Sequence, residues 1–335
     1  MAATGNPHLL QSAGWARVKS ASGWRARRFV LEGHGVAQVL VRSLPFGLVA
    51  AYAPRGPLVA ADVLALAIAA LRQALRTERC TSLLCDPEIA TGAVVRAGLS
   101  AAGIQAAPVH VQPTRTLLMD LTLDQDAMLA AMRRKTRQYI RKAERAGVVT
   151  EETADVGRFH AVLRSVAERD RFAIHDPAYF ERIRAAFGQQ AHFQIARYGG
   201  DDVGALLVVR IADRAWELFG GWSGHHSEER PFYLLKWRSL LRMKQLGAAR
   251  YDMWGLSERG TGPSRPEQPE GSEGSRDRTR REGVARPSGL EGVENFKLGF
   301  GGEVVTWIGA LETAVTPGLF PIWRLAGRRR LASSL

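Results

Sequence analysis

Residues 132–148 have the sequence MRRKTRQYIRKAERAGV, in which charged and apolar side chains recur with helical spacing. The spacing places four arginines on one face of a helix, namely Arg134, Arg137, Arg141 and Arg145. The other side carries the apolar residues Met128, Met132, Ile140 and Ala143. Gly147 favours a helix end just past the last turn. The stretch predicts a basic helix from Leu123 to Arg145, which either presents a solvated face or binds a polyanion.

The composition describes a folded, strongly basic protein. The 335 residues are enough for two domains, each with its own core. A share of 46% hydrophobic and 24% charged residues is typical of globular chains and excludes a disordered or fibrous one. The formal charge of +13 favours a polyanionic partner such as nucleic acid, an anionic membrane surface or a phosphorylated substrate. Charge alone does not choose among them.

Cysteine usage and the apolar segments indicate the compartment. Cys80 and Cys85 form neither a disulfide framework nor a zinc-ligand spacing, which fits a reducing cytoplasm. The first residues lack the continuous apolar core of a signal peptide. The most apolar region, 36–53, is interrupted by Arg42 and Pro45 and predicts two strands with a turn. We therefore expect a cytoplasmic protein that does not cross a membrane.

Strand-like and helix-like segments alternate along the chain. Strands are predicted at 36–41, 48–53, 81–85, 116–121, 193–198, 204–211, 215–220, 250–253 and 304–308. Helices are predicted at 61–76, over a short stretch ending at 97, and at 123–145, 159–169, 178–187 and 231–246. Each half has the order of a mixed α/β unit, with helices packed on a largely antiparallel sheet. The segment 257–292 is rich in Gly, Pro, Ser, Glu and Arg, which predicts a disordered loop whose arginines either are solvated or touch RNA.

Seven short strings of the sequence follow one another in a recognisable order. They are GWARVK (14–19), YAPRGP (52–57), DPE (86–88), AERD (167–170) with His175 and Tyr179-Phe180, YLLKW (233–237), YDMWG (251–255) and NFKLGFGGEVV (295–305). With the basic helix between them, they resemble the Fem family, the peptidoglycan bridge-forming aminoacyl transferases. The likeness covers nearly the whole chain, and FKLGFGG is its most specific piece. The chain lacks the long paired-helix arm of some members and is similar to the compact, FemX-like ones.

The resemblance implies a fold and a reaction. The fold is α/β (α+β): two GNAT-like acyltransferase domains in tandem, with mixed sheets and flanking helices. The first domain would comprise 1–113 plus 310–335, and the second 114–309. The donor would be aminoacyl-tRNA, and the acceptor a stem-peptide amine of a peptidoglycan precursor, either UDP-MurNAc-pentapeptide or lipid II. Both substrates are polyanions, which accounts for the basic charge, and the resemblance implies neither a cofactor nor a metal.

Attack of an amine on an ester needs a neutral amine and stabilisation of the tetrahedral oxyanion. The resemblance places Lys297, after Phe296, beside the ester carbonyl in that second role. By residue type alone, Lys297 would be an exposed lysine in a turn. Asp86 ends a predicted strand, where it either accepts a proton or only forms a turn before Pro87. No arrangement of Ser, His and Asp or of Cys and His indicates a covalent intermediate, so direct attack is expected.

The resemblance also nominates residues for substrate binding. Lys19, Tyr179 and Arg55 would bind the phosphates of the acceptor. This chain has Asp176 where some compact members carry an arginine, so either Arg169 or Arg171 substitutes or the acceptor is lipid-linked. Phe219 stands where those members can have a tyrosine. The arginines of the basic helix, Arg134, Arg137, Arg141 and Arg145, are the candidates for contact with tRNA.

Several alternatives stay open. The segment 319–323 (LFPIW) with Arg328–Arg330 would either rest on an anionic membrane or pack on the first domain. An acetyl-CoA-dependent acetyltransferase would need R/Q-x-x-G-x-G/A at a strand-to-helix turn; the matches at 11–16 and 280–285 have the wrong context. Other readings are transfer to a protein N-terminus or a small-molecule amine, and a non-catalytic RNA- or membrane-binding protein. Nothing in the sequence determines the oligomeric state.

Overall fold

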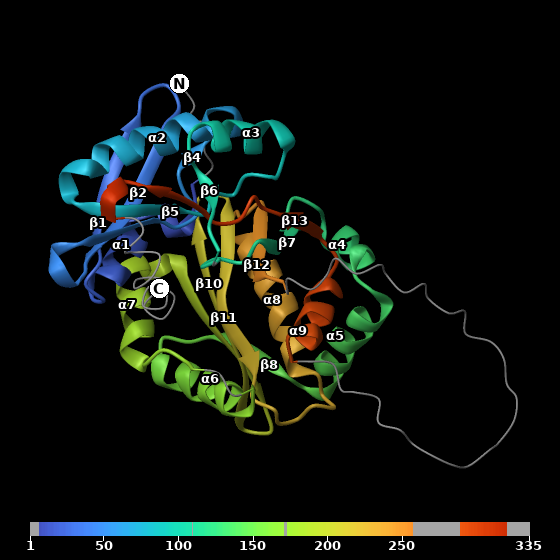
Figure 1. Ribbon diagram of the computed structural model, residues 1–335. Coiled ribbons are helices and arrows are strands. Elements are labelled where there is room, and N and C mark those ends of the chain that lie inside the picture. The colour runs from blue at the N-terminus through green and yellow to red at the C-terminus, as the bar shows by residue number, and fades with distance from the viewer. Residues whose placement is uncertain (1–6, 109, 171–172, 257–288, 320–335) are drawn as a thin grey trace, which may run out of the picture.

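The computed structural model describes residues 7–108, 110–170, 173–256 and 289–319. Within these ranges the chain builds two seven-stranded mixed sheets with helices packed against them (Figure 1). Each sheet contains one parallel pair of strands, β3/β5 in the first and β11/β12 in the second, and its other pairs are antiparallel. The arrangement agrees with the predicted mixed sheets and flanking helices.

The first sheet has the order β1-β2-β3-β5-β14-β6, with β4 paired to β2. Its strands are β1 (Arg25–Leu31), β2 (Gly35–Ser43), β3 (Val49–Ala53), β4 (Leu58–Val59), β5 (Cys80–Cys85), β6 (Gln105–Ala106) and β14 (Leu311–Ala314). Cys80 and Cys85 are buried, free thiols at the two ends of β5. Strand β14 follows all the strands of the second sheet along the chain, yet it pairs with β5 in the first sheet. The first sheet is therefore built from two segments that lie far apart in the sequence.

The second sheet has the order β13-β7-β12-β11-β10-β9-β8. Its strands are β7 (Arg115–Asp120), β8 (Val149–Glu152), β9 (Ala191–Tyr198), β10 (Asp201–Ile211), β11 (Arg214–Trp222), β12 (Arg250–Gly255) and β13 (Glu303–Thr306). The long apolar strand β10 lies between β9 and β11 and is buried over most of its length, as expected for a strand covered on both faces.

Nine α-helices of the described residues pack against the two sheets. They are α1 (Ala13–Ser20), α2 (Leu64–Ala74), α3 (Ala93–Ala101), α4 (Gln125–Ala131), α5 (Arg134–Ala146), α6 (Val156–Asp170), α7 (Pro177–Phe187), α8 (Pro231–Gln245) and α9 (Gly289–Leu298). On the second sheet, α6 and α7 lie on one side, and α5, α8 and α9 lie on the other (Figure 1). Alternate residues of β10 show this directly: Leu207 packs with α6 and α7, whereas Leu206 packs with α8.

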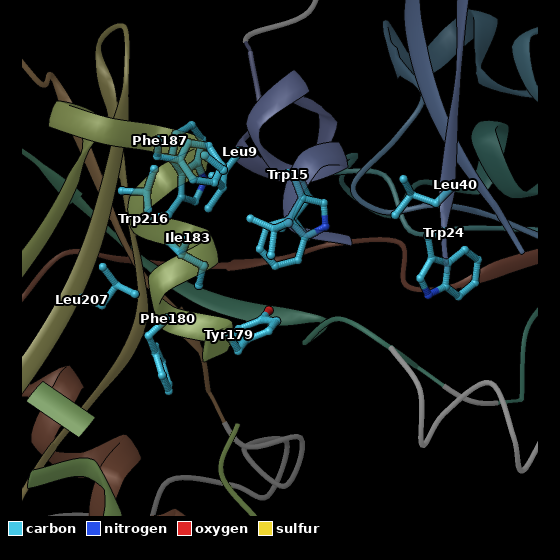
Figure 2. Close-up of a cluster of buried hydrophobic side chains, with 14 of the residues drawn as sticks. Leu9, Trp15, Trp24, Leu40, Tyr179, Phe180, Ile183, Phe187, Leu207 and Trp216 are labelled. Carbon is cyan, nitrogen blue, oxygen red and sulfur yellow. The ribbon is translucent and has the colours of Figure 1, made fainter. Parts of the chain in front are cut away.

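One hydrophobic cluster joins the two sheets through α1 and α7 (Figure 2). Trp15 of α1 and Phe187 of α7 belong to it, together with Leu40 of the first sheet and Trp216 of the second. The helices approach closely because Gly14 has no side chain. A Cβ on Gly14 would lie 2.4 Å from the ring of Phe187. Gly14 thus sets how α1 packs between the two sheets.

Replacing Gly14 with alanine is therefore expected to destabilise the fold. Overpacking of this kind typically costs about 1–3 kcal/mol, which exceeds the roughly 0.5–1 kcal/mol gained from helix propensity. Gly98→Ala in α3 is the matched control, because the nearest atom to its added Cβ is 4.0 Å away and only the propensity gain remains. Denaturant unfolding of both variants measures the difference. Equal or greater stability of Gly14→Ala would contradict this packing.

The prediction of one basic helix over 123–145 is wrong, because the segment forms two helices, α4 and α5. Met132 is extended, and the next amide, of Arg133, donates a hydrogen bond to the carbonyl oxygen of Gly299 at 2.9 Å. Gly301 packs against the end of α4, where a Cβ added to this glycine would lie only 2.6 Å from the carbonyl oxygen of Ala131. The glycine-rich turn of FKLGFGG therefore packs into the break between the helices.

Three other expectations need correction or fall outside the described residues. The predicted loop 257–292 is wrong at its end, because 289–292 begin α9; residues 257–288 lie outside the described ranges. Strands β1, β4, β6, β8 and β14 were not predicted. Arg171, the second acetyltransferase-like string at 280–285, and the segment from 320 onward, with Arg328–Arg330, are also outside the described residues.

In the part of the chain that the structure describes, no helix is both long and apolar enough to span a bilayer.

Candidate active site

The strands β11 and β12 form a wedge. They pair in parallel only where Arg214–Trp216 face Arg250–Asp252. Beyond this point both strands line a cavity of about 900 Å³. A bulge in β12 opens the wedge: Trp254 has a left-handed backbone with φ 61°, and its amide donates to the Asp252 carboxylate at 2.7 Å. The hydroxyl of Thr116 donates to the same carboxylate oxygen. Burial raises the pKa of Asp252 to about 6, and the nearby charge of Glu88 adds to that rise.

The cavity receives side chains from both faces of the second sheet. From the α8 and α9 side come Phe232, Tyr233, Lys236, Phe296 and Lys297. From the α6 side come Val166, Arg169 and Asp170, with Phe219 of β11 beside them. A cavity lined in this way passes between the separated strands and connects the two faces. Two substrates can therefore approach one point from opposite directions.

Lys297 lies in the last turn of α9, where its side chain reaches the wedge. Its ammonium group donates a hydrogen bond to the Gly255 oxygen at 2.8 Å. Phe296 anchors this turn, because its ring stacks on Phe232 at 5.3 Å and meets Tyr233 edge-on at 4.7 Å. Burial lowers the pKa of Lys297 to about 8. The lysine is thus neither in an exposed turn nor on the surface, and it presents a partly desolvated ammonium group to the cavity.

A second lysine, Lys236 of α8, forms a buried network with Glu217 of β11. Lys236 is 1% exposed, and its ammonium group donates to Oε2 of Glu217. The hydroxyl of Tyr251 donates to the same oxygen at 3.0 Å, and Ser239 lies 3.3 Å from that hydroxyl. Burial lowers the pKa of Lys236, and the charge of Glu217 opposes this. Sequence reasoning missed both residues of this pair.

The face opposite Lys297 carries three of the nominated binding residues. Lys19 of α1 is 5% exposed, and its nitrogen lies 6.0 Å from the ring centroid of Tyr179. Burial lowers the pKa of Lys19 to about 8. The rings of Tyr179 and Phe219 are 6.2 Å apart, and Phe219 lines the cavity. Lys19, Tyr179 and Phe219 thus form a path from α1 to the cavity.

Asp176, which departs from the family pattern, has a structural role here. Its carboxylate caps α7 by accepting the Tyr179 amide at 2.8 Å. Arg182, one turn later, lies 5.7 Å over the Tyr179 ring and 3.8 Å from Asp176. Arg182 therefore brings a guanidinium group to the region where the pattern lacks one, and sequence reasoning missed it. Tyr179 and Arg182 both lie on the predicted helix 178–187, and their i, i+3 spacing was the available signal.

Arg169, one of the proposed substitutes, points to the cavity but is already engaged. It forms a two-pronged ion pair with Asp170 at 2.7 Å and donates to the Trp222 oxygen at 2.6 Å. Its guanidinium also lies 5.2 Å from the Trp222 ring. These contacts shape the rim of the cavity.

Asp86 and Arg55 lie outside the lining of the cavity and support its wall. Asp86 is 2% exposed and accepts hydrogen bonds from the Tyr52 hydroxyl at 2.7 Å and the Arg55 amide at 2.5 Å. The Arg55 guanidinium donates to the Pro113 oxygen at 2.8 Å and lies 5.9 Å from the Trp254 ring. Both Pro113 and Trp254 line the cavity. This geometry favours a positioning role for Asp86 over proton transfer.

Ionisation of Asp86 should make folding stability depend on pH. Burial raises its pKa from 3.8 to about 6. A carboxyl whose pKa is higher in the folded state loses stability as the pH rises between these values, here by roughly 3 kcal/mol. Asp86→Asn removes this contribution, so its unfolding free energy should fall less than that of the wild type between about pH 4 and pH 6. Asp62→Asn, an exposed control, should behave as the wild type, and an unchanged slope in Asp86→Asn would refute the assignment.

A buried ionic cluster connects the two sheets behind the wedge. Glu88 accepts a hydrogen bond from Arg214 at 2.9 Å, and Nε2 of His8 lies 3.2 Å from its other oxygen. Burial disfavours the Glu88 carboxylate, but His8 and Arg214 outweigh it and lower the pKa of Glu88. Glu88 is the last residue of the DPE string. Its ion pair with Arg214 connects the loop after β5 of the first sheet to the paired end of β11.

The basic helix presents most of its nominated arginines to solvent. Arg134, Arg141 and Arg145 are exposed on α5. Arg137 instead turns back to the end of α4, where it donates to the carbonyl oxygens of Met132 and, at 3.2 Å, Leu129. Helix α5 packs on α8, and Tyr139 of α5 lies 4.9 Å from Tyr233, which lines the cavity. The basic surface thus adjoins the Lys297 face of the wedge.

Two absences bear on other chemistries. In the described ranges, no group of three His, Cys, Asp or Glu side chains is placed to hold a metal ion. The string at 11–16 does not form a phosphate-binding turn, because the Gln11 side chain bonds the carbonyl oxygens of Gln38 at 3.0 Å and Pro54 at 2.7 Å. Gln11 thus braces the first sheet.

The sequence of this chain is similar to those of known proteins. The chain is 28% identical over 211 residues to lipid II:glycine glycyltransferase of Staphylococcus aureus, which covers 57% of this chain and 50% of that protein. The chain therefore spans about half the length of the curated relatives it matches.

Solved structures share the fold. The crystal structure of FemX superposes with a TM-score of 0.77 at 18% identity and covers 96% of this chain and 95% of that chain. L-PGS from Bacillus licheniformis gives a TM-score of 0.53 at 13% identity, covering 93% and 92%. The similarity to FemX confirms the predicted fold class. The model of the FemAB family matches residues 2–98 and 93–201, more than half of the chain. This chain belongs to the FemAB family.

Proposed function

We propose that this protein transfers an amino acid from aminoacyl-tRNA to an amine on the stem peptide of a peptidoglycan precursor. The observation that carries the proposal is the cavity through the second sheet, with Lys297 on one face and Phe219 on the other. Family membership supports the reaction class, and the relatives in Staphylococcus aureus are named for glycine transfer to lipid II.

The chemistry needs no covalent enzyme intermediate. The neutral acceptor amine attacks the ester carbonyl carbon, so a C–N bond forms and the carbonyl oxygen becomes an oxyanion. The C–O bond to the tRNA ribose then breaks, and the proton lost by the amine ends on the released ribose hydroxyl. An ammonium group has three donors, and Lys297 uses one on Gly255. Its other donors are available to stabilise the oxyanion inside the cavity.

The opposite face would bind the acceptor. Lys19 and Arg182 flank Tyr179, with their charges 6.0 Å and 5.7 Å from its ring. Two cations on one aromatic support suit a diphosphate, which occurs in both the nucleotide-linked and the lipid-linked precursor. The stem peptide would then extend past Phe219 toward the wedge. If the acceptor is lipid-linked, the protein would also contact the inner face of the membrane peripherally.

Transfer of labelled amino acids tests this function. A pool of charged tRNAs is incubated with the protein and either UDP-MurNAc-pentapeptide or lipid II, and the products are analysed by mass. Label on a stem-peptide amine is the expected result, and the preferred acceptor follows from the two rates. No transfer to either acceptor by folded protein that binds tRNA would favour a protein acceptor or a non-catalytic role.

The exposed face of α5 should contribute to tRNA affinity. Replacing Arg134, Arg141 and Arg145 together with alanine removes up to three phosphate contacts. The slope of log affinity against log salt should then fall by about two to three. Removing Arg76, Arg79 and Arg96, exposed arginines of the first-sheet region, changes the net charge equally and is the control. If both triple variants bind tRNA alike in a salt series, α5 is not the tRNA-binding surface.

A further inference from the structure

The closed end of the wedge contains a carboxylate that the proposed mechanism does not use. Glu217 is the first residue of β11 after its pairing with β12 ends, and it lines the cavity. It is only 7% exposed. Lys236 and Tyr251 both donate to its Oε2. Its Oε1 makes no hydrogen bond with any described residue. A carboxylate has about four acceptor sites, so this oxygen can receive a further donor from a ligand.

Glu217 and Lys297 lie on the same side of the second sheet. The partner of Glu217 is Lys236 of α8, and α8 and α9 share one face (Figure 1). Lys236 also lies 5.7 Å from the ring of Phe296, the neighbour of Lys297. The residues nominated for the acceptor, Lys19 and Tyr179, belong to the other face. A group bound by Glu217 is therefore part of the donor.

The spacing along the strands fits a short bifunctional group. Glu217 is one position past the paired segment of β11, and Gly255, which holds Lys297, is three positions past that of β12. The offset is about two residues, or at most roughly 6–7 Å along the strands, and the bulge at Trp254 shortens it. An aminoacyl ester carries its α-nitrogen two bonds from the carbonyl carbon. With one hydrogen bond of about 2.9 Å at each end, it spans at most roughly 8–9 Å, which covers this offset together with the sideways distance of about 5 Å between neighbouring strands.

We propose that Glu217, held by Lys236 and Tyr251, binds the α-ammonium group of the donor amino acid and selects donors in which that amine is free. This proposal rests on the proposed function, because it requires an aminoacyl ester in the wedge. The pairing places the ester carbonyl at Lys297 and the α-ammonium at the closed end. It also keeps the donor's own amine away from the acceptor face, so that the donor does not act as the nucleophile.

Lys236 makes this carboxylate suitable for the task. The ammonium group of Lys236 forms an ion pair with the Glu217 carboxylate, and two hydrogen bonds to Oε2, from Lys236 and Tyr251, hold that carboxylate in one orientation. A buried hydrogen bond between a fixed carboxylate and an ammonium is stronger than one between neutral groups. Discrimination of roughly ten- to hundredfold between charged and uncharged donors follows.

The test compares two donors that differ only at the α-position. Aminoacyl-tRNA is one, and the α-hydroxyacyl-tRNA obtained from it by deamination is the other. For the wild type we expect kcat/KM to favour the aminoacyl donor by roughly ten- to hundredfold. For Glu217→Gln we expect the two donors to be used within about threefold of each other, chiefly because the aminoacyl rate falls. A loss of folded protein lowers both rates equally, so it does not change the ratio.

Two further variants keep the test decisive. Glu217→Gln with Lys236→Met removes both charges and leaves no unpaired lysine, and it should show the same reduced ratio. Glu228→Gln removes an exposed carboxylate near the cavity rim and should keep the wild-type ratio. Equal use of both donors by the wild type, or an unchanged ratio in the Glu217 variants, would overturn this proposal alone. Failure of the wild type to transfer from either donor would overturn the proposed function and this proposal with it.

Discussion

Replacing Lys297 with methionine is expected to lower turnover by ~10²-fold or more, the usual effect of losing one oxyanion donor. Methionine keeps the length and apolar contacts of the side chain, so α9 should stay packed through Phe296. The KM for both substrates should change little, because Lys297 acts on charge that develops only in the transition state. Steady-state transfer kinetics with a circular dichroism control measure the effect. Normal turnover in Lys297→Met would remove Lys297 from the mechanism.

The same lysine should control the alkaline side of the pH profile. Its pKa is lowered to about 8 by burial. The protonated form stabilises the oxyanion, so kcat should decline as the pH rises through that value. Lys297→Arg keeps its charge at all accessible pH values and should lose this decline, whatever its absolute rate. A decline at the same pH in Lys297→Arg would assign it to another group.

Replacing Lys236 with methionine is expected to destabilise the folded protein by roughly 3–5 kcal/mol, since it leaves Glu217 charged and unpaired in the interior. The pair is buried at both ends, with Lys236 1% and Glu217 7% exposed. The double variant Lys236→Met, Glu217→Gln should recover most of the loss, because no uncompensated charge remains.

Urea unfolding of the two single variants and the double variant forms a mutant cycle that isolates the pair. Arg238→Met is the control: Arg238 lies on the same helix as Lys236, α8, and forms an exposed ion pair with Glu144 of α5, so its loss should cost at most about 1 kcal/mol. If Lys236→Met unfolds like Arg238→Met, the buried ion pair does not hold α8 on the sheet.

The order of strands and helices could be read from the sequence because it depends on local patterns. Helix α7 illustrates this: Asp176 caps it, Pro177 begins it, and apolar residues recur with helical spacing. The break between α4 and α5 could not be read this way. It depends on contact with Gly299 and Gly301, more than 160 residues later in the chain, and a local pattern contains no such information.

Some residues of the candidate site could likewise be predicted from the sequence, and others could not. Lys297 was nominated through the distinctive string around it. Glu217 and Lys236 stand in ordinary strand and helix patterns, and only the packing of α8 on the diverging end of β11 makes them a pair. Arg55 and Asp86 were nominated for substrate chemistry, whereas their hydrogen bonds connect the first sheet to Pro113 at the cavity wall. Sequence strings identify which residues matter more readily than what each residue touches.

We propose that the aminoacyl ester enters the wedge between β11 and β12 from the α8 and α9 face. Photo-cross-linking tests it most directly, with a tRNA whose 3′ end carries a photoreactive aminoacyl group through a stable amide. Peptide mapping should locate the cross-links in α8 (Pro231–Gln245), α9 (Gly289–Leu298) and the adjoining residues of β11 and β12. Unlabelled aminoacyl-tRNA should suppress them. Cross-links confined to α6 and α7, or to the first sheet, would contradict the claim.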